Sequence, residues 1–316
     1  MKKTHIKWVI AHEPIDLFLK VADQFSKEVS EKLGDRFDIE VLSLSDYSNK
    51  YNNGVRITKH DLIDLVNSGK IEMSHIYTNW LGDINADMYA LDLPFLFRDH
   101  DHADAVLEGE IGAEMFAGIA AKSNVQPLAF TYSGGYKIVP AKFKADSVDA
   151  WAGQDVRTSL SPVCEATFKT LGANTRKDID LEVLAEAAER GEVEAGESTY
   201  VRVEPLRQDE VFGFINDTAH SLLLTSIIVN QDFFKSLDEV TQRVMSEAAF
   251  RAARAERRQS VADVPGIIAN LEAKGLEIVR LTDEQKHELE QATKPVYDEF
   301  EDMFTANLIE NIRKAH

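Results

Sequence analysis

Residues 151–173 read WAGQDVRTSLSPVCEATFKTLGA, and this stretch predicts a short strand, a polar turn and a helix. The strand covers residues 155–157. Ser161 suits the N-cap of the helix, Pro162 suits its first position because no amide hydrogen is needed there, and Gly172 closes it. Strands and helices alternate in the same way along most of the chain.

Arg157 ends this strand and faces the N-terminus of the helix. Its guanidinium group offers a bidentate fork to an anion, and the free amides of the first helical turn add partial positive charge. The stretch therefore predicts an anion site. The alternative is that Arg157 only pairs with one of the chain's many carboxylates, which spacing alone leaves open.

The composition limits the classes of partner. The 316 residues are 44% hydrophobic and 28% charged, enough to predict a soluble globular chain with a sizeable core, and no apolar run is long enough to span a membrane. With 35 basic and 54 acidic residues the net charge is -19, which argues against nucleic acid or anionic lipid as partners. A small anionic ligand would need a local positive pocket.

The single cysteine and the N-terminus bear on the compartment. Cys164 alone allows no intrachain disulfide, CxxC motif or cysteine zinc cluster. The start, MKKTHIKWVIAHEP, has the basic residues of an export signal but not its apolar core, because Lys7 interrupts it. Met1 is therefore expected to begin either a cytosolic protein or a mature form whose export signal has been removed.

The first 130 residues or so predict a β-α-β-α-β order, which favours an α/β layer with a parallel sheet. Pro14 is expected to open an amphipathic helix with Leu17, Val21, Phe25, Val29 and Leu33 on one stripe, ended by Gly34. The other expected elements are strands at 5–11, 37–42, 71–77 and 126–132 and helices at 58–68 and 102–122.

After Ser133-Gly134-Gly135 the pattern starts again, which predicts a second α/β unit. The expected strands are 136–139, 155–157, 193–196, 212–216 and 222–230, and the helices are 162–171, 181–190, 237 to about 261, 265–274 and 283–314. Two such units followed by a helical tail favour two lobes with a cleft between them. We expect lobe I at 1–131 plus about 216–253, and lobe II at about 132–215 plus about 254–316.

Signatures of catalysis are missing from the sequence. It has no GxGxxG, Walker A loop, GxSxG elbow or HExxH motif, so neither a cofactor nor an enzyme is expected. Asp99-His100-Asp101-His102 has the composition of a metal cluster, but consecutive residues diverge on a helix, and such a run usually caps one. We therefore expect no metal site.

Taken in order, several motifs resemble the solute-binding proteins of TRAP (tripartite ATP-independent periplasmic) transporters, the DctP-type family, over nearly the whole chain. Leu93-Pro94-Phe95 matches the family's L-P-F segment, and residues 151–173 match its D-L-K-G-L-K-I-R strand and the L-G-A end of the following helix. The family's E-V-Y-x-A-L-x-x-G-x-V-D motif corresponds to Glu182-Val183 with Ala187 and Gly191-Glu192-Val193-Glu194. Its T-x-H corresponds to Thr218-Ala219-His220, and its V-N-x-x-F-x-x-L to Val229-Asn230 with Phe234 and Leu237. The resemblance implies an α/β fold of the two-lobed periplasmic-binding-protein type, with a ligand cleft between the lobes and a long helix crossing both.

The resemblance also implies site residues. Arg157 falls on the arginine that clamps the ligand's carboxylate in the family. Where the family reads G-x-E-N-P this chain has Gly196-Glu197-Ser198-Thr199, so Ser198 replaces an asparagine that helps to hold the carboxylate, beside Glu197. Members of the family that bind sugar acids have a second arginine. The corresponding position in this chain is near Tyr136, beside Lys137. At the position where members of the family commonly have an aromatic residue in the pocket, this chain has Asp180.

Further candidates lie near the first and third strands. Glu13, with His12, stands where the ectoine-binding members meet a ligand amine or hydroxyl. Tyr77, Trp80 and Tyr200 are candidate pocket aromatics.

Each candidate also has a structural reading that remains open. Glu13 could only charge its helix's first turn, and Asp180 could cap the helix at 181–190. The aromatic candidates could be packing residues, and His12 and His220 structural histidines. Tyr136 and Lys137 alternate on a strand, so at most one of them should face a cleft.

The main hypothesis is a periplasmic binding protein, monomeric, that captures a small organic anion and delivers it to the membrane permease subunits of a TRAP transporter. A hydroxy acid, amino acid or sulfonate fits one arginine better than a large sugar acid does. The alternatives are an ectoine-like zwitterion as ligand, a ligand-sensing subunit of a signalling receptor, and a cytosolic hydrolase or lyase that uses Glu13 and Asp180 as acid and base with His220 assisting.

Overall fold

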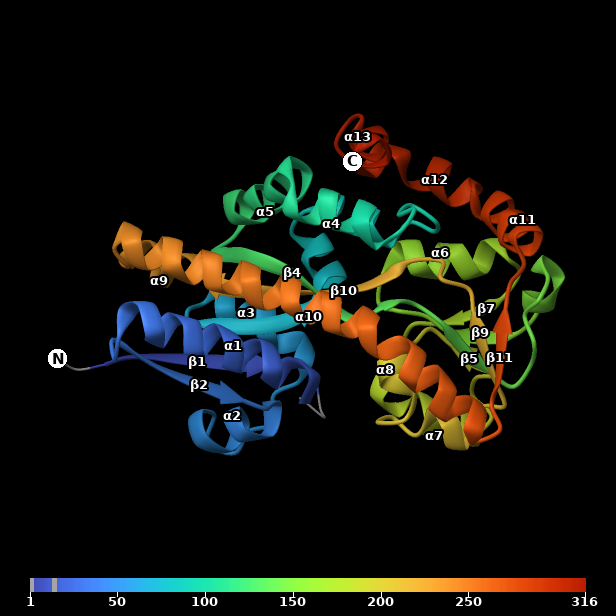
Figure 1. Ribbon diagram of the computed structural model, residues 1–316, viewed down its shortest axis with the longest axis horizontal. Helices are drawn as coiled ribbons and strands as arrows, with labels where there is room; N and C mark the ends of the chain where they lie inside the picture. The colour runs from blue at the N-terminus through green and yellow to red at the C-terminus, as the bar shows by residue number, and fades with distance from the viewer. Residues whose placement is uncertain (1–2, 13–15) are drawn as a thin grey trace. The chain divides into compact units, whose positions relative to one another are not determined.

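The computed structural model describes residues 3–12 and 16–316. The chain divides into two units, each built from three separate stretches (Figure 1). Unit 1 comprises Met1–Asn85, Leu107–Tyr132 and Leu224–Arg258, and unit 2 comprises Ala86–Val106, Ser133–Leu223 and Gln259–His316. Two α/β units and a long helix, α10 (Glu239–Ala273), confirm the predicted fold class.

Unit 1 contains a five-stranded sheet in the order β2-β1-β3-β10-β4. The strands are β1 (Thr4–Ile10), β2 (Phe37–Leu42), β3 (Met73–Tyr77), β4 (Val125–Tyr136) and β10 (Leu222–Asn230). β1 pairs in parallel with β2 and β3, as the β-α-β order predicts, whereas β10 pairs antiparallel with β3. The parallel prediction therefore holds only for the first three strands, because β10 enters from the late part of the chain rather than through a crossover helix.

Helix α1 (Asp16–Leu33) and the first part of α10 cover one face of this sheet (Figure 1). Val21, Phe25 and Val29 are buried in the core between them and Leu33 packs against it, which confirms the predicted stripe. Pro14 lies outside the described residues, and the side chain of Leu17 is not described. The remaining helices of unit 1 are α2 (Leu44–Tyr51), α3 (Leu62–Asn67), α5 (Glu110–Lys122), α9 (Gln231–Ser236), and the 3-10 turns η1 (Lys59–Asp61) and η2 (Thr78–Asp83).

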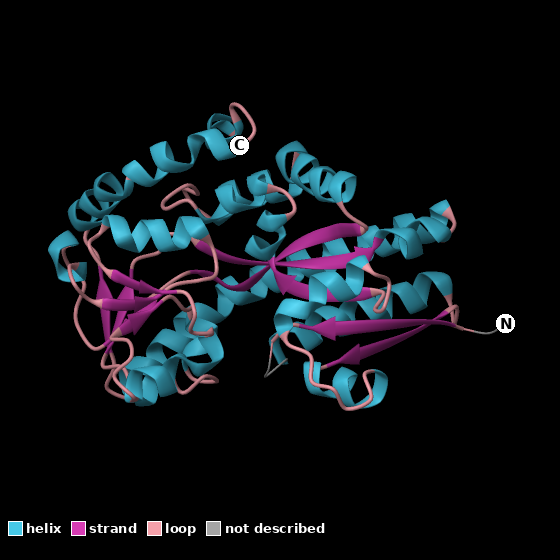
Figure 2. Ribbon diagram, turned by 180° about the vertical axis from the view of Figure 1, so that it is seen from behind, coloured by secondary structure: helices cyan, strands magenta, loops and turns pink. Residues whose placement is uncertain are grey.

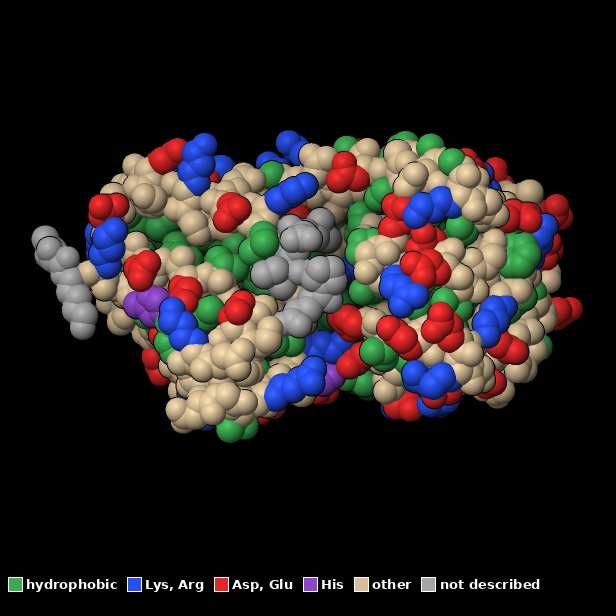
Figure 3. All heavy atoms as spheres, turned by 90° about the horizontal axis from the view of Figure 1, so that it is seen from below, with side chains coloured by type: hydrophobic (Ala, Val, Ile, Leu, Met, Phe, Trp, Pro, Cys, Tyr) green, Lys and Arg blue, Asp and Glu red, His purple; other side chains and the backbone are tan. Residues whose placement is uncertain are grey.

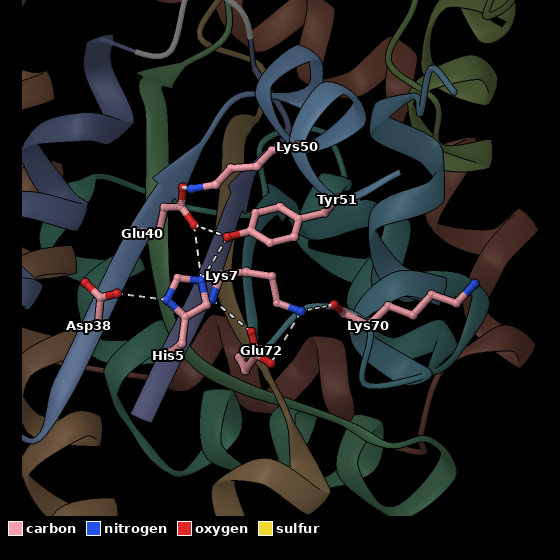
Figure 4. A network of polar contacts seen from close by, with 8 residues as sticks. All are labelled: His5, Lys7, Asp38, Glu40, Lys50, Tyr51, Lys70 and Glu72. Carbon is pink, nitrogen blue, oxygen red and sulfur yellow. Dashed lines mark hydrogen bonds and ion pairs between the residues drawn. The ribbon is translucent and has the colours of Figure 1, made fainter. Parts of the chain in front are cut away.

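Helix α2 was not predicted from the sequence, although its start carries a capping box. The Ser43 hydroxyl accepts from the Asp46 amide, and the Asp46 carboxylate accepts from the Ser43 amide. Side chains on α2 then bind the edge strand β2, since the Tyr51 hydroxyl donates to Glu40 at 2.5 Å and Lys50 pairs with the same carboxylate (Figure 4). A hydrogen bond and an ion pair therefore fix this short helix against the sheet.

Unit 2 contains a six-stranded sheet in the order β11-β9-β5-β8-β6-β7. The strands are β5 (Val139–Ala141), β6 (Asp155–Arg157), β7 (Asn174–Arg176), β8 (Ala195–Gly196), β9 (Phe214–Asp217) and β11 (Glu277–Arg280). β6 lies between β8 and β7 and is parallel to both, so Arg157 ends a central strand. Figure 2 shows the strands of both sheets from behind.

Helices pack on both faces of the second sheet. One core joins Val156 to Trp151 and Phe168, and another joins Ile138 to Tyr200 and Leu271. The helices of unit 2 are α6 (Pro162–Thr170), α7 (Leu184–Glu189), α8 (Tyr200–Val203), α11 (Asp283–Thr293), α12 (Pro295–Phe300) and α13 (Leu308–Lys314), with 3-10 turns η3 (Ala86–Asp92), η4 (Val148–Trp151), η5 (Leu181–Val183), η6 (Gln208–Glu210) and η7 (Glu301–Met303). Helix α4 (His100–Glu108), like β4, β10 and α10, has residues in both units.

Two predicted breaks are absent, and two helices predicted to be continuous are divided. β4 continues through Gly134 and Gly135, where the sequence suggested an interruption, because both glycines adopt positive φ and so pass a bend without steric cost. α10 continues through Pro265, although the sequence predicts that a separate helix starts there. The predicted helices at 102–122 and 283–314 are instead divided near Gly109 and between α11, α12 and α13.

Acidic and basic side chains are interspersed over unit 2 on the face shown in Figure 3. No helix among the described residues is long and apolar enough to cross a membrane. In the same part of the chain no group of three or more His, Cys, Asp or Glu side chains could hold a metal ion. Of the Asp99–His102 run, Asp99 accepts from the His102 amide as a cap does, and the His102 ring bonds to the carbonyl of Ile312.

Candidate anion site

The end of β6 in unit 2 presents a buried arginine. Arg157 is 8% exposed, its Nε donates to the carbonyl of Ile179 at 2.9 Å, and its Nη1 donates to the carbonyl of Glu197 at 3.2 Å. Both acceptors are neutral main-chain oxygens. Within residues 3–12 and 16–316 no carboxylate forms an ion pair with this guanidinium, so the simple surface pairing that the sequence left open is not what the structure shows.

The N-terminus of α6 follows Arg157 closely. Ser161 occupies the predicted N-cap and Pro162 the first turn, but the Ser161 hydroxyl makes no capping hydrogen bond. The hydroxyls of Ser161 and Thr158 are both buried and have no hydrogen-bond partner among the described residues. Buried hydroxyls are normally satisfied, so this segment has unused donors beside an unpaired cation.

Ser198 and Ser221 add two further hydroxyls without a partner in the described structure. The main chain of Ser198 pairs with Ile138, and the carbonyl of Ser221 accepts from the Lys137 amide at 2.8 Å. Both serines therefore lie beside the segment that connects β4 to β5. Ser221 was not among the predicted residues, because a single serine in an apolar run carries no recognisable pattern.

Behind Arg157 lies a fully buried charge network centred on Glu197. Lys137 is completely enclosed, and its Nζ lies 3.0 Å from both Glu197 Oε1 and Cys164 Sγ and 3.6 Å from Asp92 Oδ1. The Nε2 of His220 lies 3.1 Å from the same Glu197 oxygen. The Ser159 amide donates to the other oxygen, Glu197 Oε2.

Burial and neighbouring charges set the protonation of this network. Burial acts to raise the pKa of Glu197, but the Lys137 ammonium and the His220 ring favour the carboxylate, so the pKa lies well below its usual range. Burial acts to lower the pKa of Lys137, whereas the hydrogen bond to the Cys164 sulfur and the negative charges of Glu197 and Asp92 favour the ammonium and raise the pKa above its usual value. Lys137 and Glu197 are therefore an ionised pair.

Two other groups of the network are neutral. Burial, with Asp92 and Glu197 nearby, raises the pKa of the Cys164 thiol well above its usual value. Burial lowers the pKa of His220, although Glu197 opposes this. A neutral ring that donates from Nε2 to Glu197 accepts at Nδ1 from the Thr218 hydroxyl, 2.7 Å away. Both ring nitrogens are thus occupied, which leaves His220 no free position to act as a base.

Two of the motif segments meet at this network. The Phe95 amide donates to the carbonyl of His220 at 2.6 Å. Phe95 and Ala219 both have positive φ values, 57° and 45°, which L-residues rarely adopt. Strained backbone of this kind gathers at binding sites, where the surrounding structure holds it in place.

The other predicted residues of unit 2 lie in different surroundings. Tyr136 is half-buried, its hydroxyl donates to the carbonyl of Phe97 at 3.3 Å, and burial raises its pKa. Asp180 is exposed and holds the N-cap position of η5 without a capping bond, directly after the Ile179 carbonyl that Arg157 contacts. Tyr200 is buried in the core beside Ile138, the packing role that the sequence left open.

Four predicted residues belong to unit 1, and the structure describes three of them. The His12 ring stands edge-on to Tyr77 at 4.3 Å between centroids, and Tyr77 contacts Trp80 at 5.0 Å. His12 also stacks on Phe18 at 4.5 Å, so these rings form a continuous series at the ends of β1 and β3. Glu13 lies outside the described residues.

Comparison with known proteins decides the family. Residues 10–303 match the model described as bacterial extracellular solute-binding protein, family 7. The chain belongs to this family. Solved structures described as TRAP periplasmic solute-binding proteins share its fold, which confirms the resemblance found in the motifs.

Relatives of this solute-binding protein are distant in sequence and near in structure. It is 25% identical to the C4-dicarboxylate-binding protein DctB of Bacillus subtilis over 92% of this chain and 80% of the relative. The structure from Sulfurospirillum deleyianum with bound succinate has a TM-score of 0.85 at 24% identity, covering 100% of both chains. That from Pseudomonas putida F1 with bound D-glucuronate has a TM-score of 0.87 at 20% identity, covering 99% of this chain and 98% of the other.

Proposed function

We propose that this protein captures a small organic anion in the periplasm and delivers it to the membrane permease subunits of a TRAP transporter, with one ligand bound per monomer. The observation that carries the proposal is the Arg157 guanidinium, buried without a carboxylate partner in the described chain beside the start of α6. A buried cation without a counter-charge favours an anionic ligand. The hydroxyls of Thr158, Ser161 and Ser198 supply further donors.

The charges of unit 2 favour a ligand with one acid group. Lys137, the other cation near the site, is already paired with Glu197 and lies near Asp92. It is completely enclosed, so a ligand cannot reach it without disrupting that pair. This supports a hydroxy acid, an amino acid or a sulfonate over ligands that need two arginines. Relatives described as binding C4-dicarboxylates and structures holding succinate or glucuronate support the broader class of organic acids.

A zwitterion is the second candidate ligand, and the ring series of unit 1 is the observation that favours it. Tyr77 and Trp80 contact each other at the end of β3, and aromatic rings attract cations such as an ammonium group. The hydrolase alternative has less support, because His220 has both ring nitrogens occupied.

The test is calorimetric titration of the purified protein with a panel of acetate, lactate, succinate, glutamate, taurine, D-glucuronate and ectoine. Arg157→Ala should weaken the tightest binder by about 2–5 kcal/mol, the range for truncating one member of a buried charge pair. Arg176 is the matched control, because it lies opposite Arg157 in the β6–β7 register but is paired with Asp178. Arg176→Ala should bind as the wild type does.

Two results would contradict the proposal. Undiminished affinity in Arg157→Ala would remove Arg157 from the site. Consumption of a panel compound during the titration would indicate an enzyme. Tighter binding of ectoine than of every simple acid would favour the zwitterion.

A further inference from the structure

Glu197, directly after β8, holds Arg157 in place together with the carbonyl of Ile179. The Glu197 amide donates to the Arg157 carbonyl at 3.0 Å, and the Glu197 carbonyl accepts from Arg157 Nη1 at 3.2 Å. Glu197 thus contacts both the main chain and the guanidinium of Arg157. Because Arg157 is held through these contacts, its position depends on how firmly Glu197 itself is held.

The side chain of Glu197 supplies that anchoring. One carboxylate oxygen accepts from Lys137 and His220, and the other accepts from the Ser159 amide, two residues beyond Arg157. The side chain is only 2% exposed, and both of its oxygens accept hydrogen bonds from protein groups. A carboxylate would also repel an anion, so direct contact with the proposed ligand is unfavourable.

We propose that the Glu197 carboxylate is a positioning residue for the anion site: it holds the Ser159 main chain, and with it Arg157 and the start of α6, in the geometry that binds an anion, without touching the ligand. This rests on the proposed function. It assigns Glu197 a different role from the direct ligand contact that the motif suggested.

The negative charge of Glu197 and its positioning role predict opposite changes in anion affinity for Glu197→Gln. Glu197→Gln removes a negative charge near the site, which on Coulombic grounds alone should tighten anion binding. The amide of glutamine, however, must turn a donor group toward either the Ser159 amide or the Lys137 ammonium, so one of these contacts is lost. Positioning therefore predicts weaker binding, by about tenfold, the loss expected for one hydrogen bond to a charged group.

The experiment measures two quantities on each variant. The first is hydrogen exchange of the Ser159 amide without ligand, followed by NMR, which reports whether the carboxylate holds this segment. The second is the dissociation constant of the panel acid that the wild type binds most tightly. Glu194→Gln is the matched control, because the Glu194 carboxylate accepts from the Asp155 amide at the other end of β6.

The expected result is faster Ser159 exchange and about tenfold weaker binding in Glu197→Gln, with Glu194→Gln like the wild type. Glu197→Asp, which keeps the charge but is one methylene shorter, should behave like Glu197→Gln. If Glu197→Gln fails to fold because Lys137 is left poorly paired, Glu197→Asp, which keeps the charge beside Lys137, carries the test.

Unchanged Ser159 exchange, or equal or tighter anion binding, in the folded variant would overturn the inference. Its failure can be told from failure of the proposed function. Undiminished binding in Arg157→Ala overturns the function whatever Ser159 does. If no panel acid binds, the Ser159 exchange measurement alone decides whether Glu197 holds the segment.

Discussion

The guanidinium of Arg157 is oriented by the protein but is not neutralised by a carboxylate among the described residues. Its Nε and Nη1 donate to the main-chain oxygens of Ile179 and Glu197, which orient the guanidinium without neutralising it. Carbonyl partners satisfy part of the fork and reduce the desolvation cost, but they provide no counter-charge. An anion that enters such a site gains an attraction that water does not screen strongly.

His220 gives a prediction on stability and pH at the residue scale. Its pKa is lowered by burial in the folded protein, so the unfolded chain binds more protons below about pH 6.5. The stability contributed by the neutral ring is therefore present above that pH and is lost as the pH falls. His220→Asn should lose less thermal stability than the wild type between about pH 7 and pH 5.

Thermal unfolding of both proteins at the two pH values measures this difference. The control is His287→Asn, which changes an exposed histidine on α11 and should follow the wild type. An equal fall in the midpoint for His220→Asn and the wild type would show that His220 does not carry this pH dependence.

At the scale of elements, replacing glycine by alanine is expected to have opposite effects on stability at two positions. Gly134 lies in β4 with a φ of +97°, and an added Cβ would lie 2.5 Å from the Thr199 hydroxyl oxygen. Gly134→Ala should destabilise the protein by at least about 1–2 kcal/mol, because both the backbone and the contact oppose a side chain.

Gly266 lies in α10, is exposed, and has no atom within 4 Å of the position of an added Cβ. Gly266→Ala should therefore stabilise the protein by about 1 kcal/mol, the difference in helix propensity between the two residues. Denaturant unfolding of the two variants and the wild type measures the change in the free energy of unfolding for each substitution. A shift in the same direction for both would contradict the assignment of these glycines.

Element prediction from the sequence worked where one local signal was sufficient. The stripe of α1, the cap position at Ser161 and strand β6 follow from spacing and capping residues, and the structure confirms them. It failed at Pro265 and at the Gly134–Gly135 pair, where residues that usually interrupt an element lie inside a longer one. Tertiary packing overrides propensity there, since α10 and β4 both have buried core residues along them.

At the scale of the whole molecule, the net charge of -19 predicts a response to salt. Like charges across a folded chain repel, and salt shortens the range of that repulsion from about 30 Å at 10 mM to about 10 Å at 100 mM. The thermal midpoint should therefore rise when NaCl is added over this range.

Chloride binding at the anion site could produce the same rise, so Arg157→Ala is the control. If screening of the net charge is the cause, the variant and the wild type should rise equally. A rise confined to the wild type would attribute the effect to an ion at Arg157, and a fall in both would contradict the repulsion argument.

The sequence by itself determined the α/β class, the family, and the placing of Arg157 between a strand and a helix N-terminus. These depend on residues close together in the chain. Tertiary structure decided what surrounds Arg157. Lys137 meets Cys164 and Glu197 across 27 and 60 residues, and whether it binds a ligand or a buried carboxylate depends on how those segments pack. Burial and charge pairing are properties of the packed molecule, so no local pattern in the sequence reports them.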